Sequence, residues 1–320
     1  MKRYGWLLGC CLFLSIGMLW AADEPDLRML QQKAAQSRDM EGYVGVCKYL
    51  YQTEENPELL LLYADSIHQL ATKSKKPEQL VEYYIWASEG NFIKGDFQQG
   101  YALKRKAIAL AEKAGLKFAI SQSCCDMGYY CNVDARYDSA RYYFRKGLEA
   151  GEDLSEAGEA CRTMLTNYAS SFLFEGKTDS ALVYTIRASE RSAADKDTAM
   201  LIENLNQLGT IYRRKKNLEN CIANFEQALH LCELRGNHNA VAFIYGNIAT
   251  AYCDWNRPVD AIPFSEKAVE YALKTGNKRR IGTCYVNLGA IQIRLVQMRA
   301  EGIATLLKAC LLYTSPSPRD

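Results

Sequence analysis

Apolar and small residues recur along the chain with a period of about forty residues, and each period has the spacing of two amphipathic helices. The clearest copy carries Gly209 and Tyr212 in its first half, then Cys221, Phe225 and Ala228 in its second half. With Gly209 counted as position 8 of the copy, these residues stand at positions 8, 11, 20, 24 and 27. The spacing predicts a first helix and a second helix in every copy, packed against each other through the small residues.

Position 8 holds a small residue in most copies, and it tracks the repeat along the chain. In successive copies it is occupied by Lys48, Ser88, Gly128, Ala169, Gly209, Ala249 and Gly289. The first copy departs from the small-residue rule at Lys48 and Leu60. In the last copy Gly302 and Ala309 arrive one residue late, which indicates a one-residue insertion. The repeat therefore extends over residues 41–309 and is strongest over 121–275.

This pattern resembles the tetratricopeptide-repeat (TPR) family, in which positions 8, 20 and 27 are small and positions 11 and 24 are aromatic. The resemblance implies an all-α fold, a right-handed α-solenoid of antiparallel TPR helical hairpins, with about seven copies. Small residues would let the two helices of a hairpin approach closely, and aromatic residues would fill the space between that hairpin and its neighbours. The copies are longer than the usual repeat, and no proline closes the second helix.

Composition agrees with a helical fold, and the charge balance limits the classes of partner. Residues 78–257 contain no proline, and 48% of the whole chain is apolar, enough for a continuous core. Basic and acidic residues number 39 and 37, a formal net charge of +2. Nucleic-acid-binding surfaces show a strong basic excess, so this balance argues against a nucleic-acid partner. The basic runs at 213–216 and 278–280 fall at predicted turns, where charges are solvated.

The N-terminal segment has the pattern of a targeting sequence. Lys2 and Arg3 precede an apolar run over residues 5–20, and the chain turns polar at Asp23. A basic start, a short apolar stretch and small residues before a polar start are typical of a secretory signal peptide, which we predict over residues 1–22. The alternative is an uncleaved membrane anchor. Residues 23–40 are predicted to form an N-terminal capping helix.

The C-terminal segment, residues 310–320, breaks the periodic pattern with the sequence CLLYTSPSPRD. It resembles the conceptual translation of a transposase-based sequencing adapter in one reading frame. A natural Ser/Pro tail is the alternative. We therefore expect the native repeat to end near Ala309 in this chain, and we exclude 310–320 from the predicted fold.

Cysteine is abundant, with twelve in the chain, and histidine is scarce, with three. Nine cysteines remain after Cys10, Cys11 and Cys310 are set aside, and most occupy predicted core positions, so we interpret them as buried free thiols. A metal cluster around Cys124 and Cys125 is the weaker alternative, because no second CxxC pair or nearby histidine accompanies them. No catalytic or nucleotide-binding motif is present, so we predict no enzyme activity, no cofactor and no metal.

Polar residues recur at position 6 of the first helix. In the family that the chain resembles, positions 2, 5, 6, 9 and 12 of this helix face a concave groove. Side-chain amides both donate and accept hydrogen bonds, so they can satisfy the backbone of an extended ligand. The alternative is that they bond only to neighbouring helices. The predicted peptide-binding residues, at positions 6 and 9, are Asp126, Tyr129, Asn167, Gln207, Thr210, Asn247, Thr250 and Asn287.

Position 2 of the first helix argues against one known mode of binding. TPR proteins that clamp a C-terminal carboxylate carry lysines at positions 2 and 5, and this chain has none there. Position 2 is occupied instead by Gln122, Thr163, Glu203, Phe243 and Thr283. Binding of a free C-terminal carboxylate through such a clamp is therefore not predicted.

Together these patterns predict a protein- or peptide-binding TPR module outside the cytoplasm. Exported bacterial TPR proteins of this kind often continue into a membrane helix followed by a LuxR-type or histidine-kinase regulator. The resemblance thus implies a sensor ectodomain of a truncated membrane-anchored regulator, either periplasmic or anchored facing the periplasm. A freestanding periplasmic scaffold for complex assembly is the alternative. Membrane association is expected only through an uncleaved signal or a missing C-terminal segment.

Overall fold

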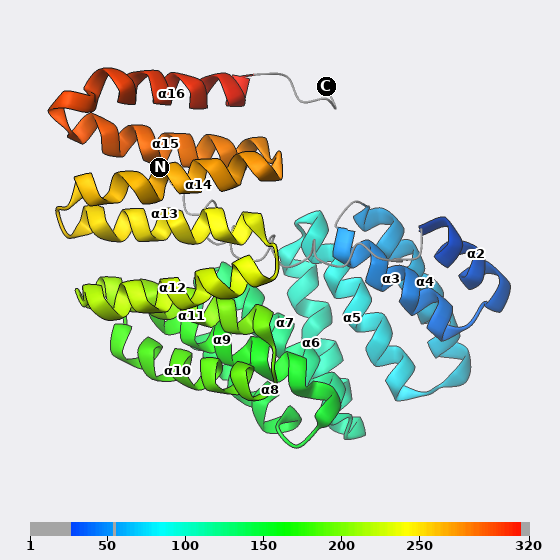
Figure 1. Ribbon diagram of the computed structural model, residues 1–320. Helices are drawn as coiled ribbons and strands as arrows, with labels where there is room; N and C mark the ends of the chain where they lie inside the picture. The colour runs from blue at the N-terminus through cyan, green and yellow to red at the C-terminus, as the bar shows by residue number, and fades with distance from the viewer. Residues whose placement is uncertain (1–26, 54–55, 315–320) are drawn as a thin grey trace. The chain divides into compact units, whose positions relative to one another are not determined.

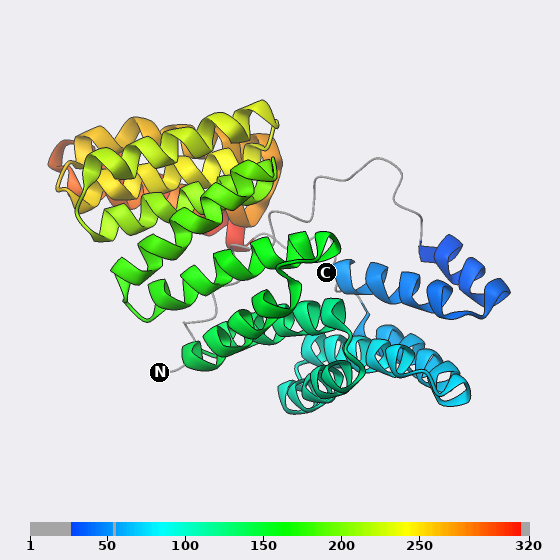
Figure 2. The same cartoon turned by 90° about the horizontal axis from the view of Figure 1, so that it is seen from below.

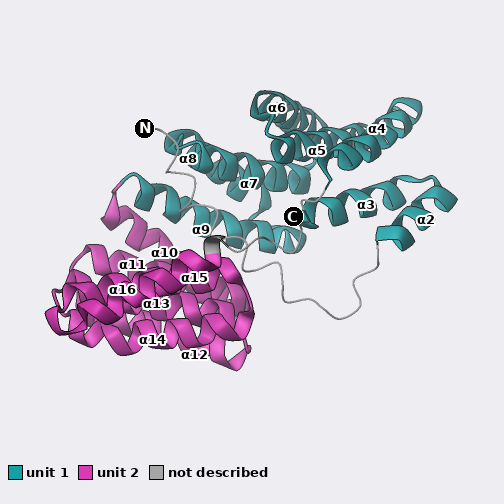
Figure 3. Cartoon of the chain, turned by 90° about the horizontal axis from the view of Figure 1, so that it is seen from above, with its two compact units in different colours: residues 1–175 teal, residues 176–320 magenta. Residues whose placement is uncertain are grey.

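The computed structural model describes residues 27–53 and 56–314. Over these residues the chain forms fifteen α-helices and no strand, as the periodicity predicted. The predicted signal peptide, residues 1–22, lies outside the described residues. The chain divides into two compact units, residues 1–175 and 176–320, which Figure 3 distinguishes by colour. Each unit is a stack of helices that pack mainly against their neighbours in sequence.

The described part of unit 1 contains eight α-helices. They are α2 (Leu27–Ser37), α3 (Met40–Thr53), α4 (Pro57–Ser74), α5 (Pro77–Lys94), α6 (Phe97–Ala114), α7 (Lys117–Val133), α8 (Tyr137–Gly151) and α9 (Gly158–Phe174). The helices α3, α5, α7 and α9 are the first helices of successive copies. A short 3₁₀ turn, η1 (Ser155–Ala157), precedes α9. The helix α2 lies within the segment 23–40 where a capping helix was predicted.

Unit 2 contains seven helices. They are α10 (Thr178–Ala194), α11 (Thr198–Arg214), α12 (Leu218–Leu234), α13 (His238–Asp254), α14 (Pro258–Thr275), α15 (Lys278–Arg294) and α16 (Arg299–Thr314). The first helices here are α11, α13 and α15. Figure 1 shows α13 to α16 as successive layers, and Figure 2 shows the same antiparallel hairpins from below.

Helix boundaries follow from local chemistry that the sequence carries. Side chains of Asp197, Asn217 and Asn237 each accept a hydrogen bond from the backbone N–H three residues on, which satisfies a free donor at the start of α11, α12 and α13. At the other end, Gly115 and Gly276 cap α6 and α14 with φ of 68° and 65°. Glycine adopts this left-handed conformation without steric cost, so it ends both helices.

The small residues at position 8 let an aromatic ring enter the hairpin. A Cβ atom placed on Gly128 would lie 2.3 Å from the ring of Phe144, and one on Gly209 would lie 2.5 Å from the ring of Phe225. Both phenylalanines are fully buried. Each ring belongs to a core cluster that includes residues of the next hairpin, as predicted for the position 24 aromatics. The ring also fills the space above the glycine of its own hairpin, because the missing side chain leaves room for it.

The last copy contains the extra residue in the turn between its helices. A 3₁₀ turn, η2 (Val296–Met298), precedes α16, and Gly289 then packs against Leu306 and the carbonyl of Gly302. The same small-residue contact is thus rebuilt one position later. The helix α16 continues to Thr314, five residues past the predicted end of the array at 309. Residues 315–320 of the adapter-like segment lie outside the described part.

Cysteine side chains occupy the helix packing, as their repeat positions predicted. Of the nine cysteines between residues 47 and 284, eight are buried and Cys253 is partly exposed, while Cys310 on α16 is exposed. Burial raises the pKa of Cys47 and of Cys232 to about 12, with a smaller contribution from Glu82 and Glu233 respectively. Thiols of this kind stay protonated at neutral pH, so they behave as small apolar side chains.

None of the helices between residues 27 and 314 combines the length and the apolar character that a membrane crossing requires. Within the same part of the chain, no cluster of three or more His, Cys, Asp or Glu side chains is arranged to hold a metal ion.

Candidate functional site

The predicted binding residues all lie on first helices, at positions 6 and 9. We call positions 2, 6 and 9 of these helices the first-helix face, because residues spaced by four and then three lie along one side of a helix. The face is described separately for unit 1, on α7 and α9, and for unit 2, on α11, α13 and α15. Exposure of the predicted residues ranges from buried at Asn167 to exposed at Asn287.

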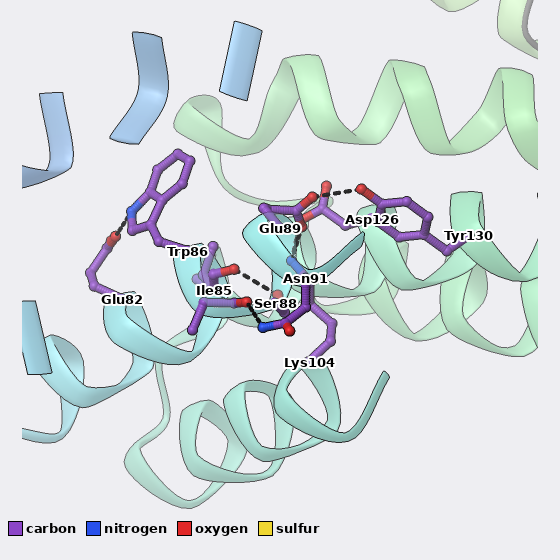
Figure 4. A network of polar contacts seen from close by, with 10 residues as sticks. Glu82, Ile85, Trp86, Ser88, Glu89, Asn91, Lys104, Asp126 and Tyr130 are labelled. Atoms are coloured by element: carbon purple, nitrogen blue, oxygen red, sulfur yellow. Dashed lines mark hydrogen bonds and ion pairs between the residues drawn. The ribbon is translucent and has the colours of Figure 1, made fainter. Parts of the chain in front are cut away.

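In unit 1, Asp126 belongs to a buried network of charges rather than to a free polar surface. Lys104 of α6 has no solvent-exposed surface, and its Nζ lies 2.9 Å from Asp126 Oδ2. The same ammonium donates to Glu89 of α5, which is 2% exposed. The Tyr130 hydroxyl donates to Glu89 Oε2 at 2.7 Å. Figure 4 shows these side chains converging from α5, α6 and α7.

The charges of this network stabilise one another at the cost of their hydration. Burial raises the pKa of Glu89, although Lys104 acts in the opposite direction. Burial alone would lower the pKa of Lys104, but the attraction of Asp126 and Glu89 outweighs it, so the pKa of this lysine is raised. A buried ammonium between two carboxylates therefore stays charged. The network joins two successive hairpins through side chains where other copies use apolar packing.

The sequence analysis missed Lys104 and Glu89, although a signal for them exists. Lys104 stands at position 24 of its copy, the position that holds Phe144 and Phe225 in other copies. A lysine at a core position must be paired or reach solvent, because an isolated buried charge is very costly. Glu89 stands at position 9, where Tyr129 stands in the next copy.

The other two predicted residues of unit 1 differ in their surroundings. Tyr129 is partly exposed and contacts the ring of Tyr130 edge-on, with 5.4 Å between ring centroids. Asn167 is 5% exposed, and its backbone carbonyl accepts a hydrogen bond from Asn132 Nδ2 at 2.9 Å. The side-chain Nδ2 of Asn167 is buried without a hydrogen-bond partner. Tyr129 is thus placed to contact a ligand, whereas Asn167 is mostly covered.

In unit 2 the position 6 side chains bond to neighbouring helices and remain partly exposed. Asn247 Nδ2 donates to Asn206 Oδ1 at 2.8 Å, which joins α13 to α11. Gln207 Oε1 accepts from the Thr185 hydroxyl at 3.2 Å, which joins α11 to α10. Asn287 of α15 is exposed. The bonds between helices favour the structural alternative at Asn247 and Gln207, and the exposed part of each side chain keeps both available to a ligand.

The two threonines at position 9 have similar local bonds. The Thr210 hydroxyl donates to the carbonyl of Asn206 at 3.1 Å, and the Thr250 hydroxyl donates to the carbonyl of Gly246 at 2.8 Å. Each donor is thereby used within its own helix, as is common for threonine in helices. The oxygen lone pairs of both partly exposed hydroxyls remain able to accept a hydrogen bond from a ligand N–H.

Glu203, at position 2 of α11, is a further polar group that the sequence analysis did not include among the binding residues. It lies one helical turn before Gln207. Its Oε2 atom is buried and has no hydrogen-bond partner among the described residues. Burial raises the pKa of Glu203 to about 7, and no other cause contributes to this shift. The available signal was its charge, since position 2 is uncharged in the two copies before it and in the two copies after it, at Gln122, Thr163, Phe243 and Thr283.

Comparisons with known proteins agree on the fold. Residues 199–274 match the family model for the tetratricopeptide repeat. The apo form of RapI is similar in structure, with a TM-score of 0.66 at 11% identity, covering 89% of this chain and 79% of that one. Aspartyl phosphate phosphatase F from Bacillus subtilis gives 0.58 at 14% identity, covering 90% and 88%.

A third similar structure contains a bound ligand. The Rap conjugation gene regulator of the plasmid pLS20, in complex with the Phr* peptide, gives a TM-score of 0.56 at 12% identity, covering 88% of this chain and 83% of that one. At these identities the likeness concerns the fold alone. No protein with a curated description matches the sequence. The matched repeat, the position-specific packing of its hairpins and the shared fold lead to one conclusion: residues 199–274 are tetratricopeptide repeats, and the described chain has the helical fold of tetratricopeptide-repeat proteins.

Proposed function

We propose that the chain binds a protein or peptide segment along its first-helix face. The observation that carries this proposal is the row of partly exposed polar groups on α11 and α13, with Asn287 following on α15. The hairpins pack through small and aromatic residues on other sides of these helices, so this row is not needed to fill the core. A regulator of similar fold is described in complex with the Phr* peptide, which supports a peptide as the class of ligand.

A random-peptide display library provides the ligand for the first test. Selected peptides should bind the wild-type chain, and the double variant Gln207→Ala/Asn247→Ala should lose about 1–3 kcal/mol of binding free energy, because a peptide backbone group is left unpaired. Titration calorimetry with one selected peptide measures the loss. The same variant also breaks the bond from Asn247 to Asn206, so it requires a matched control.

Asn206→Ala is that control. Asn206 is 7% exposed, and this variant removes the same bond between α11 and α13 while leaving the exposed amides in place. Wild-type affinity in Asn206→Ala, together with weakened binding in the double variant, supports the proposal. Equal losses in both variants would assign the effect to packing. Failure to select any peptide would contradict peptide binding.

We further propose that the protein acts outside the cytoplasm as the sensor ectodomain of a membrane-anchored regulator, with a freestanding periplasmic scaffold as the alternative. The basic start and apolar run of residues 1–22 support export. Fusing residues 1–30 to a reporter enzyme that is active only after export tests this point. Sequencing the locus past the codon for Ala309 distinguishes a regulator from a scaffold, because only the former continues into a membrane helix and a signalling domain.

We propose binding without catalysis. A TPR fold is typically a non-catalytic scaffold. One protein of similar fold is described as an aspartyl phosphate phosphatase, so hydrolysis of an acyl phosphate is the activity to assay. The proposal expects the purified chain to hydrolyse acetyl phosphate no faster than buffer does.

A further inference from the structure

Glu203, Gln207 and Thr210 form one stripe along α11. They occupy positions 2, 6 and 9, so their side chains leave the same side of the helix within about two turns. The stripe presents a carboxylate, an amide and a hydroxyl in succession. On α13 the equivalent stripe is Phe243, Asn247 and Thr250. Only the α11 stripe of unit 2 carries a charge.

The carboxylate of Glu203 lacks the partner that its surroundings call for. Its Oε2 is buried and accepts no hydrogen bond from any described residue, while the residue as a whole remains partly exposed. A buried carboxylate oxygen without a donor costs free energy, and native structures rarely tolerate one without a reason. Burial is the only cause of the raised pKa of Glu203, and no charged side chain of the described residues contributes to this shift.

Two basic side chains of unit 2, Arg280 and Arg213, have other partners. Arg280 of α15 donates from Nε to Asn239 Oδ1 at 3.1 Å, and its guanidinium lies 5.4 Å from the centre of the Phe243 ring. Arg213, at the far end of α11, lies 3.7 Å from Asp254. These cations are held by other groups in unit 2.

We propose that Glu203 binds a cationic group of the ligand, an ammonium or a guanidinium, when a peptide lies along the α11 and α13 stripes. The inference rests on the proposed peptide-binding function and names the chemistry of the ligand. Glu203 is partly exposed, so a ligand cation can reach its carboxylate from the surface and supply the opposite charge that its surroundings lack. The contact is then a charge-assisted hydrogen bond. Gln207 and Thr210 then meet the backbone of the adjoining residues, because they continue the same stripe.

Two peptide libraries test the inference. Both have random sequences and amidated C-termini, and they differ only in the N-terminus, which is acetylated in one and free in the other. The wild-type chain should select Lys or Arg at a fixed position from the acetylated library, or a free N-terminal amine from the other. Either outcome means that binding requires a cationic group in the peptide. Comparison of the two libraries distinguishes a cationic side chain from an α-ammonium group.

Two variants then connect the cation to Glu203. Glu203→Gln removes the charge with little change in shape, and Glu226→Gln removes an exposed carboxylate on α12 as the matched control. With an Arg-containing selected peptide, Glu203→Gln should weaken binding about tenfold to a hundredfold, and Glu226→Gln should leave it unchanged. Replacing the peptide arginine with citrulline should cause the same loss in the wild type and no further loss in Glu203→Gln. If an α-ammonium group is selected instead, N-acetylation takes the place of citrulline.

Three results would overturn the inference. The selected peptides could lack a required cation and still depend on Gln207 and Asn247 for binding. That result would support peptide binding but contradict the proposed role of Glu203. If citrulline weakens binding as much in Glu203→Gln as it does in the wild type, the two losses are independent. The peptide cation would then bind at a site other than Glu203. Selection of no peptide at all would contradict both this inference and the proposed function.

Discussion

At the scale of single residues, two carboxylates of the first-helix face, those of Asp126 and Glu203, have opposite surroundings. Asp126, at position 6, is neutralised by a fully buried lysine from the second helix of the preceding hairpin. Glu203, at position 2, has one buried oxygen, Oε2, without a hydrogen-bond partner among the described residues. The first therefore contributes to stability, and the second lowers stability whenever it is ionised.

The raised pKa of Glu203 makes the stability of the folded protein depend on pH. Its folded-state pKa of about 7 lies above the ordinary glutamate value of 4.5, so folding favours the protonated form. The protein therefore loses stability as pH rises from 4.5 through 7. Glu203→Gln should therefore raise the free energy of unfolding by about 2–3 kcal/mol at pH 8 and change it little at pH 4.5. Urea unfolding of both proteins at the two pH values measures this. A constant difference at both values would contradict it.

Removing the buried lysine should have the opposite effect on stability. Lys104→Met leaves Glu89 and Asp126 without their cation, so the free energy of unfolding should fall by roughly 3–5 kcal/mol. Adding Glu89→Gln removes one of the uncompensated charges and should restore part of the loss. Urea unfolding gives the energies, and hydrogen exchange should show the change in α5, α6 and α7. A loss below about 1 kcal/mol would mean that water already reaches the network.

At the scale of elements, each hairpin depends on how closely its two helices approach. The approach is set by position 8, where glycine admits the ring of the position 24 phenylalanine. In the copy with Ser88, position 24 holds Lys104, whose ammonium pairs with Glu89 of the same hairpin and with Asp126 of the next one. Different chemistry at one pair of positions therefore produces the same helical architecture.

Two glycine variants separate close packing from helix propensity. Gly209→Ala places a Cβ atom 2.5 Å from the fully buried ring of Phe225, so it should lower the free energy of unfolding by roughly 1–3 kcal/mol. Gly246→Ala on α13 places a Cβ with nothing within 4 Å, so the better helix propensity of alanine should raise stability by about 0.5–1 kcal/mol. Thermal and urea unfolding compare the two. Equal effects of both variants would refute close packing at Gly209.

At the scale of the whole molecule, the same packing determines the state of the cysteines. Eight of the nine thiols between residues 47 and 284 are buried within helix contacts in one unit or the other. Burial is the leading cause of the raised pKa of Cys124 and Cys284, to about 12 and about 11. Thiolate is the reactive form, so buried protonated thiols react slowly.

Alkylation measures this directly. Cys310 is exposed and should be modified within the first minutes, and it serves as the internal control. The eight buried cysteines should be modified only after unfolding in urea, and mass spectrometry of the unreduced protein should show them as free thiols. Three or four defined disulfides would mean that cross-links stabilise the chain where we infer packing.

Sequence alone determined the helical class and the repeat, because each depends on residues close together in the chain. Gly209 and Phe225 could be placed from their spacing, since the small and aromatic positions of the repeat have few alternatives. The predicted binding residues were assigned to a helix face in the same way, and their role in binding stays a prediction.

Only the tertiary structure decided which polar groups have partners. The bonds from Asn247 to Asn206 and from Asp126 to Lys104 join side chains 41 and 22 residues apart. Periodicity gives the face of a helix on which a residue lies, but it does not give the atoms of the neighbouring helix that lie within hydrogen-bond distance. The unpaired oxygen of Glu203 was hidden for the same reason, because burial and pairing are properties of the packed helices.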